Sequence, residues 1–587
     1  MANSKPEVEL LETQENVAAY HTQNDTLVSS FKSGEVREAN IPCYQLTVRT
    51  YTVLLCMGMA WGVCTMASIG PSTTYHYSII SVGGSSISSW IPNSALLPLI
   101  GLQPIWGTLA DRFGKKSFIV VGGVIGVAGN VVAGTANSIE FIIIGQAVNG
   151  VASSLFLLVI PAGMEIVPAS HRSLSQAIMG VVNGLMGILS LLVSGAFSTM
   201  SVDGWRWVYY FNAIFFGLSG LFILFLFQPP ANPLLREKST FEILRTIDFV
   251  GIVCLLCAVV GLVMGLVWGG RDYAWNSSRV ISFITAGIAL LIGFCIYETF
   301  GRRDGLVDHR FLECRNFLLI LTIAFLDGML MYGVNSFLPS EASALFTTSP
   351  ILIGVYLIPL NVCILVGILL ASYVLGVLKH YRVLLVLSVA TIALFCGLLA
   401  LITNDRLAMM LVFTGVIGLG VGITTVLPPV IITYAVPSHL IGTAGTLLAS
   451  TRAIGGVTGI TIFAVIEGNY AAAHLTSVIT TAVTNFGLPA SLAVDFSNSF
   501  VNGGQNSPTT IPGINSTILT TAQDVSMTVA AQAFSYVWIT NSAIAIVAMI
   551  FSLFLQDVKH KMTGHVEIPL EGRLKPNSGI KSWRSAR

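Results

Sequence analysis

The chain has 587 residues, of which 54% are hydrophobic and only 10% are charged. Soluble globular proteins carry about 25% charged residues, so this composition excludes a multidomain soluble enzyme, whose exposed surfaces need more charge. The net charge of +1 provides no basic field that would attract nucleic acid. Because the apolar runs are continuous, the composition predicts an all-α polytopic membrane protein.

The chain begins with a polar segment. Residues 1–46 are rich in Glu and contain no apolar run of the kind that a signal peptide has. We expect them to form a disordered cytosolic tail. The apolar runs that follow predict about 14 membrane helices. Their approximate ranges are 50–70, 88–109, 117–135, 139–163, 173–198, 206–228, 248–269, 279–300, 317–340, 350–375, 382–402, 408–436, 441–466 and 533–556.

Basic residues in the loops predict how these helices are oriented, because Lys and Arg concentrate on the cytosolic side. With the N-terminus inside, 13 Lys and Arg fall in inner loops and 4 in outer loops. The tail 557–587 is also basic, so both termini are predicted to be cytosolic. We expect the plasma membrane, with a vacuolar or vesicle membrane as the alternative.

The segment 467–532, between the last two predicted helices, contains no Lys or Arg and is rich in Ser, Thr, Asn and Gly. It predicts a long extracellular loop. Asn515 begins a glycosylation sequon within this loop, and Asn276 begins a second one before the helix at 279–300. Both side chains are candidate glycosylation sites.

Two stretches about 270 residues apart resemble each other. Residues 150–171 run from Gly-Val through Pro161 to Val-Pro-Ala-Ser-His, and residues 420–439 run from Gly-Val through Pro428 to Val-Pro-Ser-His. The repeat maps the fourth helix onto the twelfth, which predicts two six-helix bundles separated by a two-helix insert (6 + 2 + 6). Parallel repeats of this kind are typical of secondary transporters.

The predicted organisation therefore has five parts. They are an N-terminal tail (1–46), an N-terminal six-helix bundle (47–230), a two-helix insert with a cytosolic linker (231–314), a C-terminal six-helix bundle that includes the loop 467–532 (315–556), and a C-terminal tail (557–587).

The loop after the second predicted helix reads GTLADRFGKK at residues 107–116. Glycine permits close helix approach and tight turns. The Asp111 carboxylate can join a charge network that forms in one conformational state only, so we interpret the loop as a gating motif whose basic residues also anchor the topology. Its candidate residues are Gly107, Asp111, Arg112, Gly114, Lys115 and Lys116.

This decapeptide resembles the signature loop of the major facilitator superfamily. Further stretches resemble the 14-span drug:proton antiporter branch and, within it, the fungal trichothecene efflux pump-like family: EIVP at 165–168, GWRWVYYFN at 204–212, VDHRF at 307–311 and VNSFLP at 334–339. The resemblance covers about residues 45–560. It implies the major facilitator fold, and a transporter that exchanges protons for a small molecule rather than an enzyme.

Two positions depart from that branch. Its fourth helix usually carries an Arg linked to proton coupling, where this chain has Gln146. Its fifth helix usually has a Gly-Pro before paired small residues, where this chain reads SLLVSG at 190–195. Both departures count against the proton-antiport mechanism that the resemblance implies.

Charged residues inside the membrane are rare and indicate function. Arg452 lies within the predicted helix 441–466, and Asp327 lies about ten residues into the helix 317–340. Asp327 is either a proton-coupling or substrate-binding group, the partner of a structural ion pair, or a residue at another depth. Gln146, Asn149, Tyr332 and Asn335 are further candidates for a substrate cavity, although an interhelical hydrogen bond would explain each alone.

Sequence signals of other mechanisms are weak. Gly114-Lys115-Lys116-Ser117 lacks the spacing of a phosphate-binding loop, so ATP is not the expected energy source. Cys254 and Cys257 lie in an apolar helix without partner ligands, so we expect no metal site, cofactor or disulfide.

The sequence thus predicts a secondary transporter, acting as a monomer, that exports a small amphipathic metabolite, toxin or drug by proton antiport. The first alternative is uptake, particularly of iron–siderophore complexes, by a related branch of the superfamily. The second is a transceptor, which senses and signals, but the predicted tails carry no recognisable signalling domain.

Overall fold

Apart from one isolated bridge between Gly269 and Tyr273, the regular secondary structure of the described residues is helical in this computed structural model. The structure describes residues 46–83, 90–230, 248–270, 273–301, 314–347, 349–378, 380–437, 440–486, 488–503 and 516–556. Asn515, the C-terminal tail and all but one residue of the predicted N-terminal tail lie outside these ranges.

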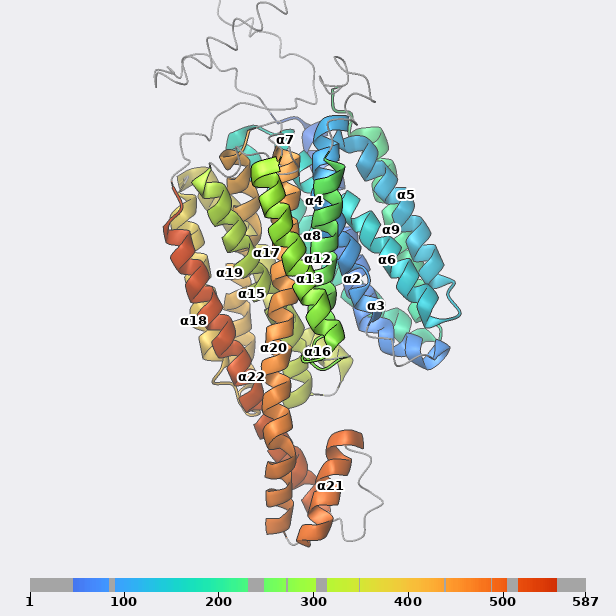
Figure 1. Ribbon diagram of the computed structural model, residues 1–587, viewed down its shortest axis with the longest axis vertical. Coiled ribbons are helices and arrows are strands. Elements are labelled where there is room, and N and C mark those ends of the chain that lie inside the picture. The colour runs from blue at the N-terminus through green and yellow to red at the C-terminus, as the bar shows by residue number, and fades with distance from the viewer. Residues whose placement is uncertain are drawn as a thin grey trace, which may run out of the picture. The chain divides into compact units, whose positions relative to one another are not determined.

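The helices follow one another along the chain as predicted (Figure 1). The N-terminal group comprises α2 (Val48–Val82), α3 (Trp90–Asn93), α4 (Leu96–Phe113), α5 (Lys115–Gly134), α6 (Ile139–Phe156), α7 (Val159–Glu165), α8 (Arg172–Met200) and α9 (Trp205–Leu226). The insert comprises α12 (Phe249–Trp268) and α13 (Ser278–Ile296). The C-terminal group comprises α15 (Arg315–Leu345), α16 (Pro350–Tyr356), α17 (Ile358–Leu378), α18 (Tyr381–Leu399), α19 (Leu407–Ala435), α20 (Ile441–Asn485), α21 (Ala490–Gly503) and α22 (Ser516–Leu553).

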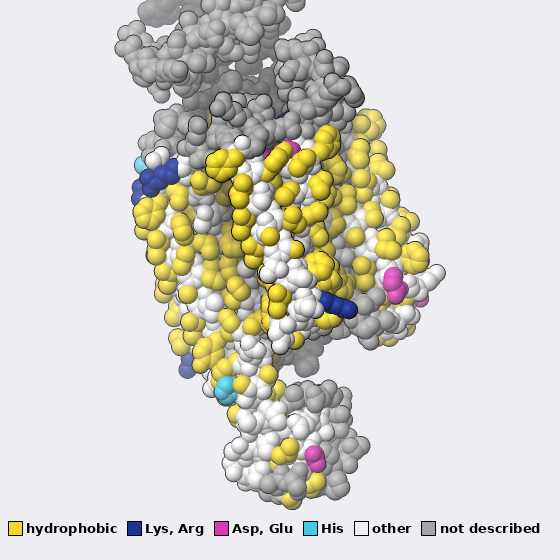
Figure 2. Space-filling model, viewed as in Figure 1, with side chains coloured by type: hydrophobic (Ala, Val, Ile, Leu, Met, Phe, Trp, Pro, Cys, Tyr) yellow, Lys and Arg dark blue, Asp and Glu magenta, His cyan; other side chains and the backbone are white. Residues whose placement is uncertain are grey.

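Thirteen helical segments of the described residues are long and apolar enough to cross a membrane, so the chain is a multi-pass membrane protein. The predicted count of fourteen is not confirmed. The remaining predicted span, 88–109, corresponds to α3 and α4, and α4 includes Gln103, Asp111 and Arg112 within its 18 residues. Figure 2 shows hydrophobic side chains covering most of the helix flanks, with the visible charges near helix ends.

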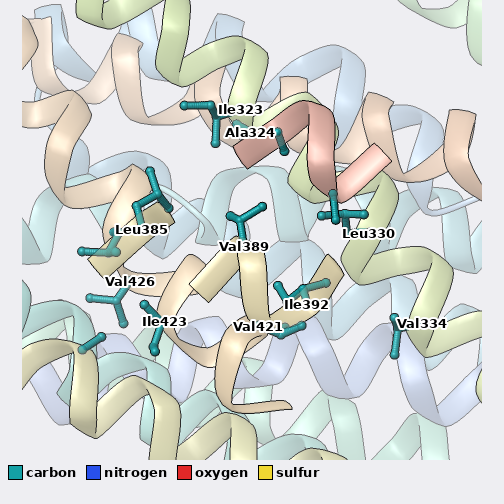
Figure 3. Packing of buried hydrophobic residues seen from close by; sticks show 14 of the residues in the cluster. Ile323, Ala324, Leu330, Val334, Leu385, Val389, Ile392, Val421, Ile423 and Val426 are labelled. Carbon is teal, nitrogen blue, oxygen red and sulfur yellow. The ribbon is translucent and has the colours of Figure 1, made fainter. Parts of the chain in front are cut away.

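Each group of helices packs around its own apolar core. In the N-terminal group α2 packs against α8 and α9, and α5 packs against α6 and α9. In the C-terminal group α17 packs against α19, α15 against α20, and α18 against α19 and α22. Figure 3 shows part of the C-terminal core, where Val389 of α18, Val421 of α19 and Ile323 of α15 belong to one buried cluster.

Four helix pairs join the groups to each other: α4 with α20 and α8 with α17 most extensively, and α8 with α19 and α7 with α20 less so. A Cβ at Gly107 would overlap the Thr446 hydroxyl, and a Cβ at Gly184 would overlap Leu365. Glycine at these positions therefore lets the helices approach each other closely. We call the end of the helices at residues 107–115 and 441–446 the inner end, following the predicted orientation, and the opposite end the outer end.

The insert packs on the α4–α20 pair. Leu255 and Val259 of α12 form a cluster with Ile100 of α4 and with Ala453 and Val457 of α20. The insert helices also lie close together, because a Cβ at Gly261 would be 3.2 Å from the Gly287 Cα. The insert therefore contacts both groups along one seam.

The segment predicted as a long loop, 467–532, is largely helical where it is described. α20 continues to Asn485, α21 follows, and α22 begins at Ser516 (Figure 1). Apolar residues with helical spacing build a small core here. Its buried members are Ile479, Val483, Leu488, Ala493, Phe496, Phe500, Ile518 and Ala522. The many Ser and Thr conceal this pattern, since their hydroxyls bond to carbonyls of their own helices, as Thr481 does to Ser477.

Gly328→Ala tests the tightest crossing in the C-terminal group. The added Cβ would overlap the Arg452 carbonyl oxygen, so α15 and α20 must separate, whereas Gly293 in α13 has no neighbour within 4 Å. We expect Gly328→Ala to lower the thermal midpoint by about 1–3 °C, in line with about 1–3 kcal/mol for overpacking in a chain of this size. Gly293→Ala should not lower it, because alanine favours the helix and meets no neighbour there. Thermal unfolding in detergent, followed by size-exclusion chromatography, measures both, and equal midpoints would contradict the crossing.

Candidate functional site: two polar clusters on α20

A buried charge network surrounds Asp111 at the inner end of α4. The Lys115 ammonium lies 2.7 Å from the Asp111 carboxylate and 2.7 Å from that of Glu165. All three side chains are nearly buried. Gly114, between α4 and α5, has φ +91°, a left-handed conformation that favours glycine and lets Lys115 turn back toward Asp111. The loop thus holds one cation between two acids.

The same carboxylate reaches across to the C-terminal group. Asp111 Oδ2 accepts hydrogen bonds from the Thr443 amide at 2.7 Å and from its hydroxyl at 2.9 Å. Thr443 lies in the first turn of α20, where backbone amides lack helical partners and the helix dipole favours a negative charge. A Cβ at Gly442 would overlap Asp111. Asp111 therefore caps α20 from the other group, while Arg112 and Lys116 are half-buried.

A second contact at the inner end joins the two repeat copies. The Arg172 guanidinium donates to the Thr433 carbonyl at 3.1 Å and lies 5.4 Å from the centre of the Tyr434 ring. The Tyr434 hydroxyl donates to the Ala169 carbonyl. In the sequence, Arg172 is one of the 13 basic residues assigned to inner loops, and no further role is predicted for it. Its position directly after the repeated Val-Pro motif was the available signal.

An ion pair lies inside the C-terminal group, midway along α15. Arg452 Nη2 of α20 is 2.7 Å from Asp327 Oδ2, and the Asp327 side chain is 3% exposed. The same nitrogen lies 3.1 Å from the Met331 sulfur. Gly455 lets the helices meet, since a Cβ there would overlap the Phe325 carbonyl oxygen. The close crossing buries the Asp327 carboxylate, while the Arg452 side chain is 18% exposed.

The other candidate residues for a substrate cavity differ in how they lie relative to this ion pair. Tyr332 packs against α20, because a Cβ at Gly456 would lie 2.6 Å from its ring. Asn335 is exposed and donates to the Met331 carbonyl of its own helix at 2.8 Å. This bond lies within α15, so it is not the interhelical hydrogen bond that the sequence offered as the alternative.

Gln146 and Asn149 lie in the N-terminal group, apart from Arg452. Gln146 Nε2 is 3.4 Å from the Tyr209 hydroxyl, and Asn130 donates to Asn149 Oδ1 at 2.8 Å. Gln146 Oε1 and Asn149 Nδ2 have no hydrogen-bond partner among the described residues. The structure thus separates the candidates into two groups rather than one site.

The outer end carries a smaller polar contact. Ser81 donates to Asp203 at 2.6 Å, and Arg206 donates to the same oxygen at 3.3 Å, so the pKa of Asp203 is lowered, first by Ser81 and then by Arg206. Arg206 also donates to the Gly134 and Ala136 carbonyls. It therefore ties α9 to the turn that follows α5.

Asn276 is exposed in the turn before α13, and Ser277 of its sequon caps that helix by accepting from the Val280 amide at 3.3 Å. Asn515 lies outside the described residues. Within the described ranges no three His, Cys, Asp or Glu gather as a metal ion would require.

Comparison with known proteins places these features in a family. The sequence model of the fungal trichothecene efflux pump (TRI12) matches residues 96–582. The chain belongs to this family. The resemblance read from the sequence motifs is thereby confirmed, and the family consists of transporters of the major facilitator kind.

Curated relatives and solved structures agree with this assignment. The chain is 26% identical to efflux pump aflT of Aspergillus parasiticus over 388 residues, which are 66% of this chain and 74% of the relative. It is 27% identical to multidrug resistance protein 3 of Bacillus subtilis over 398 residues, 67% of this chain and 74% of the relative. The solved structure of the proton:xylose symporter XylE superimposes on this chain with a TM-score of 0.56 at 12% sequence identity. The match covers 86% of this chain and 94% of XylE. The predicted major facilitator fold is confirmed.

Asp111→Asn tests the cap on α20. Loss of the carboxylate charge weakens the hydrogen bonds to Thr443, each worth about 1.5–3 kcal/mol when one partner is charged. We expect amide hydrogen exchange in residues 441–446 to become at least about 10-fold faster. Lys116→Gln, which changes a charge in the same loop outside the Asp111–Lys115–Glu165 network, should leave it unchanged. Exchange mass spectrometry measures both, and protected amides in Asp111→Asn would exclude the cap.

Proposed function

We propose that this membrane transporter exports a small amphipathic metabolite, toxin or drug in exchange for protons. The Arg452–Asp327 pair carries the proposal, because an acid inside a membrane protein is the kind of group that binds and releases protons during transport. The relatives support export, because they include proteins named efflux pumps in Aspergillus parasiticus and Gibberella fujikuroi. The acurin A biosynthesis cluster transporter of Aspergillus aculeatus supports a secondary metabolite as cargo.

Transport would proceed by alternating access, with the predicted bundles 47–230 and 315–556 rocking against each other. The contacts of Asp111 with Thr443 and of Arg172 with Thr433 hold the inner ends together, which fits a state closed toward the cytosol. Opening this end requires both contacts to break. Since each is a hydrogen bond to a charged group, substrate or proton binding must supply the difference in free energy between the two states.

The membrane, the oligomeric state and the orientation of the transporter are part of the same proposal. We place it in the plasma membrane as a monomer, with both termini and the Asp111 loop on the cytosolic side. The exposed Asn276 and the sequon at Asn515 would then face outward and be open to glycosylation. The predicted insert 231–314 would move with the α4–α20 seam that it covers.

Uptake remains the second candidate. α8 runs without a break from Arg172 to Met200 and has no Pro before Ser194, unlike the antiporter branch that the sequence resembles. This observation favours a related branch that imports iron–siderophore complexes.

Direction of transport separates the two candidates. If the protein exports, a strain lacking its gene should accumulate more of an amphipathic dye such as rhodamine 6G than the parent strain, and restoring the gene should reverse the increase. A fall in accumulation, or a fall in iron–siderophore uptake, would favour import. Accumulation is measured by fluorescence for the dye and with labelled iron for the siderophore.

Asp327→Asn tests the coupling role against a merely structural ion pair. If Asp327 carries the proton, proteoliposomes that contain Asp327→Asn should no longer take up rhodamine 6G when a pH gradient is applied. The double variant Asp327→Asn with Arg452→Gln, in which the pair is neutral, should not restore this uptake. If the pair is structural, the double variant should recover transport, because it leaves no unpaired buried charge. Asp405→Asn, an exposed acid in the loop before α19, is the matched control.

A further inference from the structure

α15 carries a second buried acid whose surroundings differ from those of Asp327. Glu341 is 1% exposed, and its Oε2 accepts a hydrogen bond from the Trp538 indole of α22 at 3.0 Å. Trp538 is fully buried. Among the described residues this neutral indole is the one polar partner of Glu341, whereas Asp327 faces the Arg452 guanidinium.

No cation is within reach of Glu341 on the helices that pack against α15, which are α16, α19, α20 and α22. None of their titratable or charged side chains forms a hydrogen bond or ion pair with it. These side chains are Tyr356, Tyr434, Arg452, Glu467, Tyr470, His474, Asp524 and Tyr536. A buried carboxylate with only a neutral donor is costly, and a neutral carboxylic acid is not. The observed packing therefore suits the protonated acid.

The position of Glu341 places it near the outer end. It lies 14 residues beyond Asp327 on the same helix (341 − 327), which is about 21 Å at 1.5 Å per residue. Pro339 lies two residues before it and has no amide hydrogen, so the Asn335 carbonyl loses its usual helical partner. The last turn of α15 can therefore bend away from α22 without breaking a further backbone hydrogen bond at this point.

We propose that Glu341 is a second proton-binding residue, which takes up a proton at the outer end and, while neutral, fixes the last turn of α15 against α22 through Trp538. The inference rests on the proposed proton antiport and adds its outer step. A proton from water adds to the carboxylate, and one oxygen of the resulting acid accepts the indole hydrogen bond. Release of the proton to water restores the charge, which must then be hydrated, so the last turn of α15 leaves α22.

Infrared difference spectroscopy of the protein in nanodiscs detects the proton directly and needs no transported substrate. Wild-type protein should show the carbonyl band of a protonated carboxyl, which disappears as the pH is raised. Glu341→Gln, which keeps an oxygen for the indole hydrogen bond but cannot titrate, should lack this band. Trp538→Phe should move it to higher frequency, because the carbonyl loses its donor. Glu467→Gln, a half-buried acid on α20, is the matched control and should leave the band unchanged.

Amide hydrogen exchange over residues 340–346 tests the mechanical consequence. After correction for intrinsic chemistry, exchange in wild-type protein should rise at least about 10-fold across the pH range in which the band disappears, and Glu341→Gln should abolish this rise. If Glu341→Gln shows the same carbonyl bands as wild-type protein, or if exchange depends on pH equally in both proteins, the inference is overturned. Loss of proton-driven transport is tested separately with Asp327→Asn, so the proposed function and this inference can fail independently.

Discussion

The carboxylate of Asp111 at the first turn of α20 is the contact on which the arrangement of the two groups depends. One oxygen binds Lys115 within the N-terminal group, and the other accepts two hydrogen bonds from Thr443 in the C-terminal group. Free amides at a helix start need an acceptor, and a buried carboxylate needs donors, so each satisfies the other. Glycine at 107 and 442 makes the approach possible.

The scarcity of charge gives each intramembrane charge a specific partner. Arg452 pairs with Asp327, while Glu341 has only an indole. One helix, α15, thus carries two acids at different depths with different partners, and the proposed proton-binding roles rest on that contrast.

α20 links the inner contact to the outer helices. Its 45 residues form one unbroken helix of about 67 Å, which carries Thr443 at its start, Arg452 further along, and Ile479 in the outer core. A continuous helix transmits displacement along its axis because its backbone hydrogen bonds resist compression. A shift of α20 along its axis at the inner end would therefore move the ion pair and the outer helices together.

The sequence by itself determined the family, the fold and nearly all membrane helices, because hydropathy and the loop at 107–116 are local signals. It also singled out Asp327 and Arg452, since charge within an apolar run is visible without a structure. Tertiary structure alone decided that Asp111 caps α20, that Glu341 faces Trp538, and that Gln146 lies apart from Arg452. Those relations join residues far apart in the chain, and helix crossing at glycines, rather than local pattern, sets them.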